Sequence, residues 1–153
     1  MAKILILSGI SNSGKSSYAS KLVQQHPQAF VIVNRDKLRE AHYGYTEETV
    51  KYYYTHVDFN YMESQITAVQ DKLIDFWLKR GKDVIIDNTN LKKSYIEEFK
   101  KFGVLTEVKF FDITLKEALT RNMSRNRKVD EEVIERQYSQ YINLRKNFAE
   151  IEK

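Results

Sequence analysis

The sequence predicts an α/β fold of three layers, in which a short parallel sheet lies between two layers of helices. Two observations predict it: short apolar runs recur along the chain, and longer stretches with helical periodicity separate them. Strands that alternate with helices form β-α-β units, whose strands lie parallel and are covered on both faces. The length of 153 residues is that of one domain, so we expect residues 1–153 to form a single unit.

Short apolar runs between polar segments mark the expected strands, about four or five in number. The clearest are Ile4–Leu7, Phe30–Val33 and Val84–Ile86, and a less regular run covers Val108–Ile113. Because the first three runs are apolar without alternation, both faces of these strands are expected to be buried.

The stretches between these runs are expected to form helices. In chain order they are Lys15–Gln25, a helix beginning near Asp36, a long helix from about Glu47 to Arg80, about Lys92–Phe102, a helix beginning near Leu115, and about Glu131–Glu150. The long helix is predicted because its apolar residues, such as Tyr53, Val57 and Tyr61, fall on one helix face. The single proline, Pro27, ends the first helix, and Gly81 follows the long helix as a C-terminal cap residue would.

The composition excludes several classes of protein. With 42% apolar and 30% charged residues, the chain is expected to fold as a soluble globular protein. It contains no cysteine, which excludes disulfides, thiolate metal sites and a cysteine nucleophile, and suits a reducing cytosol. No targeting or membrane-spanning segment is visible, so we expect a cytoplasmic protein (in the host cytoplasm if a phage encodes it) without a membrane partner. The net charge of +4 permits a polyanionic partner.

The expected turn between the first strand and the first helix, Gly9–Ser16, matches the motif G-x-x-x-x-G-K-[ST] in full. In such a P-loop, backbone N–H groups point at phosphate oxygens, the lysine (Lys15) reaches the β- and γ-phosphates, and the next hydroxyl (Ser16) holds Mg²⁺. A glycine-rich turn capped by serines is the alternative, which the full match in this context disfavours. The residues expected to bind ATP are Gly9, Ser11, Asn12, Ser13, Gly14, Lys15, Ser16 and Ser17, with Arg121 and Arg125 from later in the chain.

The rest of the chain narrows the class of P-loop protein. It contains neither the Asn-Lys-x-Asp motif that reads guanine nor the Asp-x-x-Gly motif of a GTPase switch. A motor or AAA-type ATPase is expected to be longer and to carry sensor elements. Small phosphotransferases remain, and these carry an acceptor-binding set after the second strand and an arginine lid late in the chain.

The second strand leads into the segment Asn34-Arg35-Asp36-Lys37-Leu38-Arg39, where Asp36 and Arg39 share a helix face. Ligands of open α/β sheets bind beyond the carboxyl ends of the strands, so Asp36 is expected near the P-loop. A carboxylate can take the proton of an acceptor hydroxyl, and an arginine can hold an anionic group of the acceptor. The alternative, a capping aspartate and a solvated arginine, is disfavoured beside a P-loop.

Asp87 ends the third apolar run and is followed by Asn88-Thr89-Asn90. A carboxylate at the end of a buried strand beside a P-loop resembles a Walker-B group, which orients Mg²⁺ or its waters. An Asx turn leaving the strand is the alternative. We expect Asp87 to act at the metal, through water, and at the acceptor.

Four basic residues cluster late in the chain, with no acid between positions 121 and 128. They are Arg121, Arg125, Arg127 and Lys128. Arginines of a lid can spread over the β- and γ-phosphates and stabilise charge in the transition state. A solvated helix end is the alternative, although such an end would more often mix charges of both signs.

These residues resemble the 5′-kinase domain of the bacteriophage-type polynucleotide kinases, within the P-loop kinase superfamily. The resemblance covers nearly the whole chain and rests on the P-loop, on Asn34-Arg35-Asp36-x-x-Arg39, on residues 87–91, and on Arg121-Asn122 followed by Ser124-Arg125. It implies a three-layer P-loop kinase fold with an arginine-bearing helical lid. It also implies ATP as donor, Mg²⁺, and the 5′-hydroxyl end of a nucleic acid as acceptor and partner.

The same resemblance implies a role for each matching residue. Lys15 and Ser16 would handle the donor phosphates. Asp36 would be the general base on the 5′-hydroxyl, and Arg39 would bind the 3′-phosphate of the acceptor. Arg125 would be the lid arginine on the transferring phosphate, so the catalytic set would be Asp36, Lys15 and Arg125.

The chain departs from the phage family in two respects. There the acid directly precedes the threonine of the Thr-Asn-Leu motif, whereas here Asn88 does so and the acid is Asp87. No Asp-x-Asp phosphatase motif and no Asp-Gly dipeptide of a ligase motif occurs, so a stand-alone kinase is expected. The phage family forms homo-oligomers, and the resemblance leaves that state open for this chain.

Ten tyrosines are many for this length, and five of them lie just after the acceptor motif. The bases of a single strand stack on aromatic faces. Tyr53 and Tyr54 are expected to be core positions of the long helix. Tyr43 and Tyr45, beside Gly44 in a loop, are expected to contact the acceptor.

Two other functions stay open on the sequence alone. One is a P-loop kinase of a small acceptor, such as a nucleoside, a nucleotide or a modified base, because an aspartate and an arginine suit any hydroxyl beside an anion. The other is a nucleotide-dependent binding switch, against which the missing switch motifs and the candidate base both argue.

Overall fold

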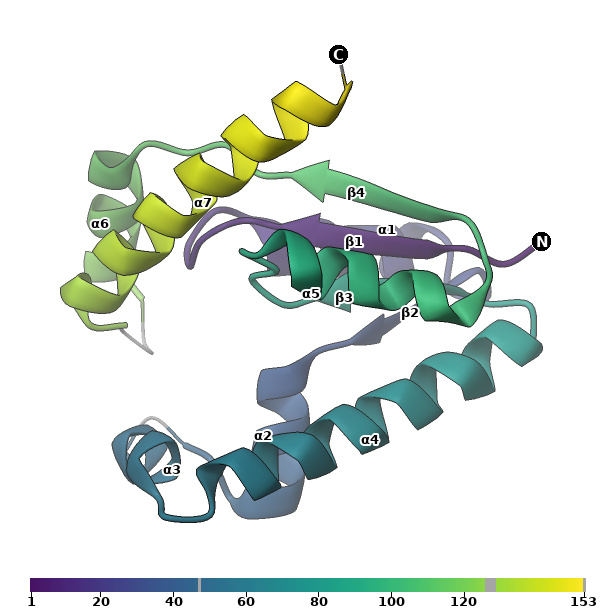
Figure 1. Ribbon diagram of the computed structural model, residues 1–153, viewed down its shortest axis with the longest axis horizontal. Coiled ribbons are helices and arrows are strands. Elements are labelled where there is room, and N and C mark those ends of the chain that lie inside the picture. The colour runs from purple at the N-terminus through teal and green to yellow at the C-terminus, as the bar shows by residue number, and fades with distance from the viewer. Residues whose placement is uncertain (47, 126–128, 153) are drawn as a thin grey trace.

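The computed structural model describes residues 1–46, 48–125 and 129–152, with side chains up to Phe148. The elements in chain order are β1 Ile4–Ser8, α1 Lys15–Gln25, β2 Phe30–Val33, α2 Arg35–Tyr43, α3 Val50–Thr55, α4 Phe59–Lys79, β3 Asp83–Asp87, α5 Lys93–Glu98, the 3₁₀ turn Phe99–Phe102, β4 Thr106–Phe110, α6 Leu115–Met123 and α7 Glu131–Glu152 (Figure 1). Strands and helices alternate for much of the chain, which confirms the predicted α/β fold.

The described strands form one parallel sheet in the order β2-β3-β1-β4. Ile6 of the central strand β1 pairs with Ile86 of β3 on one side and with Val108 of β4 on the other. All four carboxyl ends therefore lie at one edge of the sheet, where the P-loop follows β1.

The last strand ends earlier than the sequence predicts, at Phe110 instead of Ile113. The reason is the length of its neighbour. Strand β1 ends at Ser8, which lies opposite Phe110, so residues beyond Phe110 have no strand beside them.

Helices cover both faces of the sheet, and the core lies on either side of it (Figure 1). On one face, Ala19 of α1 packs against Leu5 and Leu7 of β1. On the other face, side chains of α4, α5 and α7 pack against the alternate residues of the same strand. Because β1 presents apolar residues to both layers, it reads as a continuous apolar run.

The predicted long helix is wrong in one respect: the chain forms α3 and α4 instead, with a break at residues 56–58. His56 has an extended backbone, and its Nδ1 accepts a hydrogen bond from the backbone N–H of Asp58 at 3.0 Å. Phe59 packs against Tyr53 and Tyr54 across the break. The apolar spacing continues through the bend, which is why periodicity alone predicts one helix.

The segment predicted as a helix over Lys92–Phe102 is also divided, into α5 and a 3₁₀ turn that ends at Gly103. Within the described residues, no helix has the length and apolar character needed to cross a membrane.

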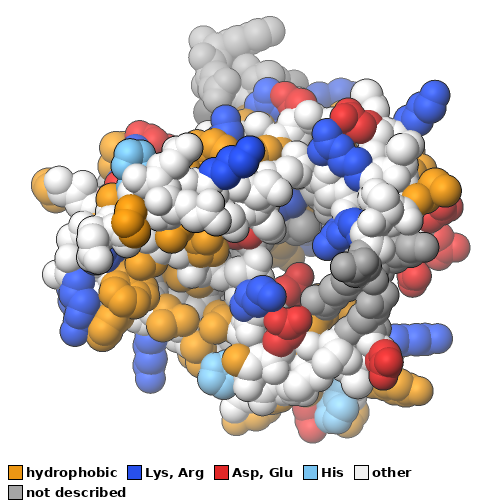
Figure 2. All heavy atoms as spheres, turned by 180° about the vertical axis from the view of Figure 1, so that it is seen from behind, with side chains coloured by type: hydrophobic (Ala, Val, Ile, Leu, Met, Phe, Trp, Pro, Cys, Tyr) orange, Lys and Arg blue, Asp and Glu red, His pale blue; other side chains and the backbone are white. Residues whose placement is uncertain are grey.

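Seen from behind, acidic and basic side chains gather around a hollow near the middle of the molecule (Figure 2).

Candidate active site

The turn after β1 has the backbone conformation of a phosphate-binding loop. Asn12 and Gly14 both have positive φ, of 70° and 99°, so the chain curls before α1 begins. At Gly9 a Cβ atom would lie 2.7 Å from Ser13 Oγ and 3.0 Å from Phe111 Cβ, so a side chain there would force its neighbours to shift. Both glycines of the motif are therefore required by the shape of the turn.

Lys15 lies inside this loop, with 8% of the residue exposed. Its Nζ donates to the backbone oxygen of Ile10 at 2.9 Å. Burial lowers the pKa of Lys15 to about 8; the negative charges of Asp87 and Asp36 oppose that change, and Arg125 adds to it. Three charged residues that the sequence singled out thus act electrostatically on the P-loop lysine.

Ser16 and Asp87 meet at the start of α1. Ser16 Oγ donates to Asp87 Oδ2 at 2.9 Å, and Asn34 Nδ2 approaches the same oxygen at 3.4 Å. A hydroxyl and a carboxylate are hard oxygen ligands, which suit Mg²⁺ held partly by a few protein groups and partly by phosphates and water. Among the described residues, no cluster of three or more His, Asp or Glu side chains could hold a metal alone.

The loop after β3 is joined to the P-loop. Gly9 donates its backbone N–H to the carbonyl oxygen of Thr89 at 3.0 Å. Asn90 is 5% exposed, and its Nδ2 donates to the carbonyl oxygen of Leu7 at 2.7 Å. Asp87 is therefore fixed relative to the P-loop through both the sheet and this loop.

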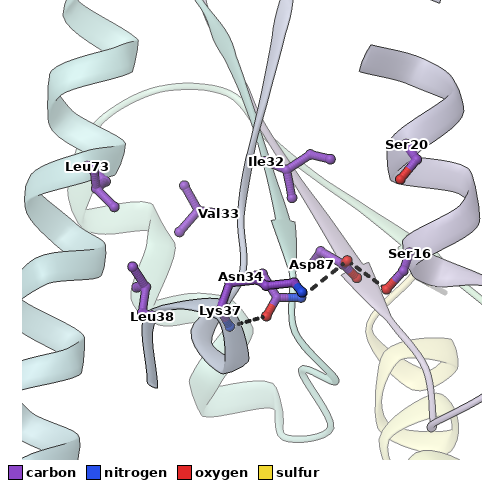
Figure 3. Close-up of a pocket in the computed structure, with 9 residues that line it drawn as sticks. All are labelled: Ser16, Ser20, Ile32, Val33, Asn34, Lys37, Leu38, Leu73 and Asp87. Carbon is purple, nitrogen blue, oxygen red and sulfur yellow. Dashed lines mark hydrogen bonds between the residues drawn. The ribbon is translucent and has the colours of Figure 1, made fainter. Parts of the chain in front are cut away.

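A cavity of about 370 Å³ opens beside the Ser16–Asp87 pair, between α1, β2, α2 and α4 (Figure 3). Ile32, Leu38 and Leu73 form part of its apolar wall. Asp36 and Arg39 belong to the same helix α2 as Leu38, but they do not line the cavity. The cavity therefore adjoins the expected metal position without containing the expected base.

Asp36 and Arg39 lie on one face of α2, as their spacing predicts, and they form an ion pair there, with Arg39 Nη1 at 2.7 Å from Asp36 Oδ1. The two side chains differ in exposure, since 54% of the Asp36 side chain is exposed against 11% for Arg39. Asp36 is thus open to a ligand while its partner is buried. An exposed, ionised carboxylate is able to accept a hydrogen bond from an acceptor hydroxyl, and the arginine beside it fixes its position.

Glu63 of α4 is the functional candidate that the sequence did not reveal. It accepts hydrogen bonds from Arg39 Nη2 at 2.7 Å and Nε at 3.1 Å, and from the Tyr53 hydroxyl at 2.6 Å. Arg35 also pairs with it, at 3.4 Å. Glu63 is 24 positions beyond Arg39 and lies on α4, which packs against α2, so no spacing rule finds it.

The electrostatics of this network follow from its hydrogen bonds. Burial opposes the charge of Arg39, but the hydrogen bonds to Glu63 and the negative charges of Glu63 and Asp36 together outweigh it and raise the pKa of Arg39. Burial likewise opposes the charge of Glu63, but the bonds from Arg39 and Tyr53 outweigh it and lower the pKa of Glu63. Both groups are therefore charged at neutral pH, and helix α2 is pinned to α4.

The tyrosines are arranged differently from the expectation. Tyr53 is buried as expected, but Tyr54 is 46% exposed. Tyr45 is only 6% exposed and packs edge-on against Tyr53. Contrary to the expectation, its ring is therefore not open to an acceptor. Tyr43, at 36% exposure, is the one of the two proposed contact residues that reaches the surface.

The two arginines expected to belong to a lid contact the P-loop. Arg125 Nη1 donates to Asn12 Oδ1 at 2.6 Å, and Arg121 Nη1 donates to the backbone oxygen of Asn12 at 2.9 Å. Arg127 and Lys128 of the same predicted cluster lie outside the described residues. A second contact that the sequence did not predict comes from α7, where Gln137 Oε1 accepts the backbone N–H of Ser11 at 2.9 Å.

Comparison with known proteins begins with a family model described as an AAA domain, which matches residues 4–144. The sequence alone disfavours an AAA-type ATPase, because such proteins are expected to be longer. The matched AAA domain nevertheless fits within the 153 residues of this chain. Among curated proteins, the chain is 28% identical over 151 residues to a protein of Autographa californica nuclear polyhedrosis virus that is named a bifunctional polynucleotide kinase/RNA ligase. That match covers 93% of this chain and 21% of the viral protein.

Two solved structures resemble the fold. A chain of the Pnkp1/Rnl/Hen1 RNA repair complex has a TM-score of 0.78 and 24% identity, over 95% of this chain and 46% of that chain. The APS kinase CysC of Mycobacterium tuberculosis has a TM-score of 0.59 and 17% identity, over 80% of this chain and 69% of that chain. The chain thus spans less than half the length of the viral protein and of the repair-complex chain.

Proposed function

The chain belongs to this AAA-domain family, and from that premise we propose that it is an ATP-dependent kinase of polynucleotide ends. It would move the γ-phosphate of ATP to the 5′-hydroxyl of DNA or RNA. The observation that carries the proposal is that three elements meet at the P-loop. Asp87 accepts a hydrogen bond from Ser16 at 2.9 Å, and Arg125 donates to Asn12 at 2.6 Å. Helix α2, which carries Asp36, begins beside Asp87, where the backbone N–H of Arg35 donates to Asn88 Oδ1 at 2.8 Å. A donor site, a metal carboxylate, a lid arginine and a candidate base are then parts of one site. The names of two relatives, a polynucleotide kinase and an RNA repair complex, support the choice of acceptor.

In this proposal the P-loop holds the donor. Backbone N–H groups of residues 9–17 and the Lys15 ammonium bind the phosphates of ATP. Ser16 and Asp87 would hold Mg²⁺, directly or through water, and the ion would supply positive charge against the phosphates. Arg121 and Arg125 would leave Asn12 and turn to the β- and γ-phosphates, since both now bond to the loop that ATP would occupy. Arg121 also pairs with Glu117 of its own helix, at 2.7 Å.

The acceptor lies on the other side of the site. Asp36 takes the proton of the 5′-hydroxyl as its oxygen bonds to the γ-phosphorus and ADP leaves. Arg39 holds the 3′-phosphate of the same nucleotide. Its bonds to Glu63 and Asp36 fix the guanidinium beside the candidate base. Tyr43 is a candidate contact further along the strand, and Asp87 could orient the 5′-hydroxyl as well as the metal.

The experiment that tests this function is a transfer assay with Mg²⁺ and γ-labelled ATP on several acceptors. These are a 5′-hydroxyl oligonucleotide of DNA, its RNA equivalent, nucleoside 3′-monophosphates and free nucleosides. We expect label on the oligonucleotides and, less efficiently, on nucleoside 3′-monophosphates. Label on free nucleosides alone would contradict the polynucleotide acceptor, and tight ATP binding without transfer would indicate a binding switch. Size-exclusion chromatography with light scattering tests whether the protein forms a homo-oligomer.

A further inference from the structure

We propose that the exposed ring of Tyr54 is the stacking surface for the terminal nucleobase of the acceptor, an inference that rests on the proposed function. The sequence places this tyrosine in the core, and the structure places it at the surface of α3, with 46% of the residue exposed. Its immediate neighbours in the aromatic cluster, Tyr45 and Tyr53, are each only 6% exposed. Of these three rings, Tyr54 alone is open to a ligand.

The position of the ring relative to the acceptor residues carries the proposal. The Cζ atom of Arg39 lies 5.9 Å from the centre of the Tyr54 ring, and Arg39 pairs with Asp36 at 2.7 Å. In a nucleotide the sugar joins the base to both the 5′- and the 3′-oxygen. With the 5′-hydroxyl at Asp36 and the 3′-phosphate at Arg39, the base lies within the reach of one sugar from both, which is where this ring is.

The ring is also held in place before any ligand arrives. It packs edge-on against Tyr53 at 5.4 Å and Tyr45 at 6.1 Å, and lies 5.4 Å from the tilted ring of Phe59. A ring fixed by its neighbours loses little side-chain freedom when a base stacks on it. The residue is partly exposed and its aromatic ring lies next to a guanidinium, and both features are found in stacking sites for single strands.

The chemistry predicts a subsite that reads the presence of a base and not its identity. Every base has a flat aromatic face, so stacking tolerates all four bases. A kinase that acts on arbitrary ends needs this tolerance. Tyr52 on the same helix is more exposed, and within the described residues its ring packs against no other aromatic ring and is not one of the rings beside the Arg39 guanidinium. It therefore provides a matched control.

The test compares Tyr54→Ala, Tyr54→Phe and Tyr52→Ala on two oligonucleotides, one ordinary and one whose 5′-terminal nucleotide lacks its base. For Tyr54→Ala we expect KM for the ordinary oligonucleotide to rise about ten- to a hundredfold. KM for the abasic oligonucleotide and KM for ATP should stay unchanged. Tyr54→Phe and Tyr52→Ala should behave as the wild type, and all three variants should keep the wild-type circular dichroism spectrum.

Equal effects of Tyr54→Ala on the two oligonucleotides would overturn the proposal, because the ring would then act without a base. No effect on either would overturn it as well. Both outcomes differ from failure of the proposed function, in which the wild-type protein transfers no phosphate to either oligonucleotide.

Discussion

Ser16 Oγ and Asp87 Oδ2 lie 2.9 Å apart, which joins the first turn of α1 to the end of β3. The two residues are 71 positions apart, and the pairing of β1 with β3 brings them together. The hydroxyl donates to the carboxylate in this state. Mg²⁺ would replace that proton as the partner of the carboxylate, so we infer that this hydrogen bond occupies the place of the metal.

We therefore predict that Ser16→Ala raises the Mg²⁺ concentration needed for half-maximal transfer by about tenfold or more. The reason is that one of the oxygen ligands of the ion is lost. Transfer is measured against Mg²⁺ concentration at saturating ATP. Ser20→Ala, one turn along the same helix, is the control and should leave the Mg²⁺ dependence unchanged. An unaltered curve for Ser16→Ala would argue against a metal at this position.

Asp36→Ala should lower the rate of the chemical step by about a hundredfold or more, because the base is removed. Its effect on folding should be small, since the carboxylate is 54% exposed and an ion pair of that exposure contributes about 1 kcal/mol or less. Single-turnover transfer and ATP binding are measured side by side. Asp75→Ala, with a side chain of 52% exposure that pairs with Lys79, is matched for surface charge and should be fully active. Full activity of Asp36→Ala would remove the role of base from Asp36.

Glu63→Gln should lower the free energy of unfolding at pH 7 by about 1–3 kcal/mol, because charged hydrogen bonds to Arg39 and Tyr53 are weakened. Since the folded state lowers the pKa of Glu63, its contribution is present above the ordinary value of 4.5 and is lost as the pH falls below it. The difference between wild type and variant should therefore shrink on acidification below about pH 4.5. Urea unfolding at several pH values measures it, and a constant difference across the range would contradict the assignment.

The fold and the candidate site differ in how much of them the sequence predicts. The sheet, helix α1 and the Asp36–Arg39 pair depend on local patterns, such as apolar runs, a complete motif and a spacing of three. Glu63, Gln137 and Tyr54 depend on where distant elements meet. Gln137 reaches Ser11 from 126 positions away, and no pattern in either segment announces that contact. The exposure of Tyr54 was missed for a related reason. The spacing of apolar residues continues through the bend at His56, so the pattern predicts one long helix with Tyr54 on its buried face.

Arg125→Ala should lower the transfer rate by about a hundredfold or more and weaken ATP binding far less, if the side chain acts on charge that develops in the transition state. In this structure Arg125 is bonded to Asn12 Oδ1, so losing it removes only an exposed contact and should leave the fold intact. The control is Arg80→Ala, at the end of α4, which should be fully active. Equal losses in ATP affinity and in rate would instead indicate that Arg125 binds the donor in its ground state.

The affinity for ATP should fall as the pH rises through about 8, because burial lowers the pKa of Lys15 to about that value and only the charged ammonium attracts the triphosphate. Below that pH, Lys15 is already protonated and Kd should be flat. Above it, binding must be accompanied by uptake of a proton, and Kd should rise by up to about tenfold for each pH unit. Calorimetry between pH 6.5 and 9.5, in buffers of different ionisation enthalpy, measures both the affinity and the protons taken up. Lys15→Met is the control, which should bind weakly at every pH and take up no proton in this range. A wild-type Kd that does not change across pH 8 would contradict the prediction. It would mean that Lys15 stays charged over this range and that burial does not lower its pKa in the protein that binds ATP.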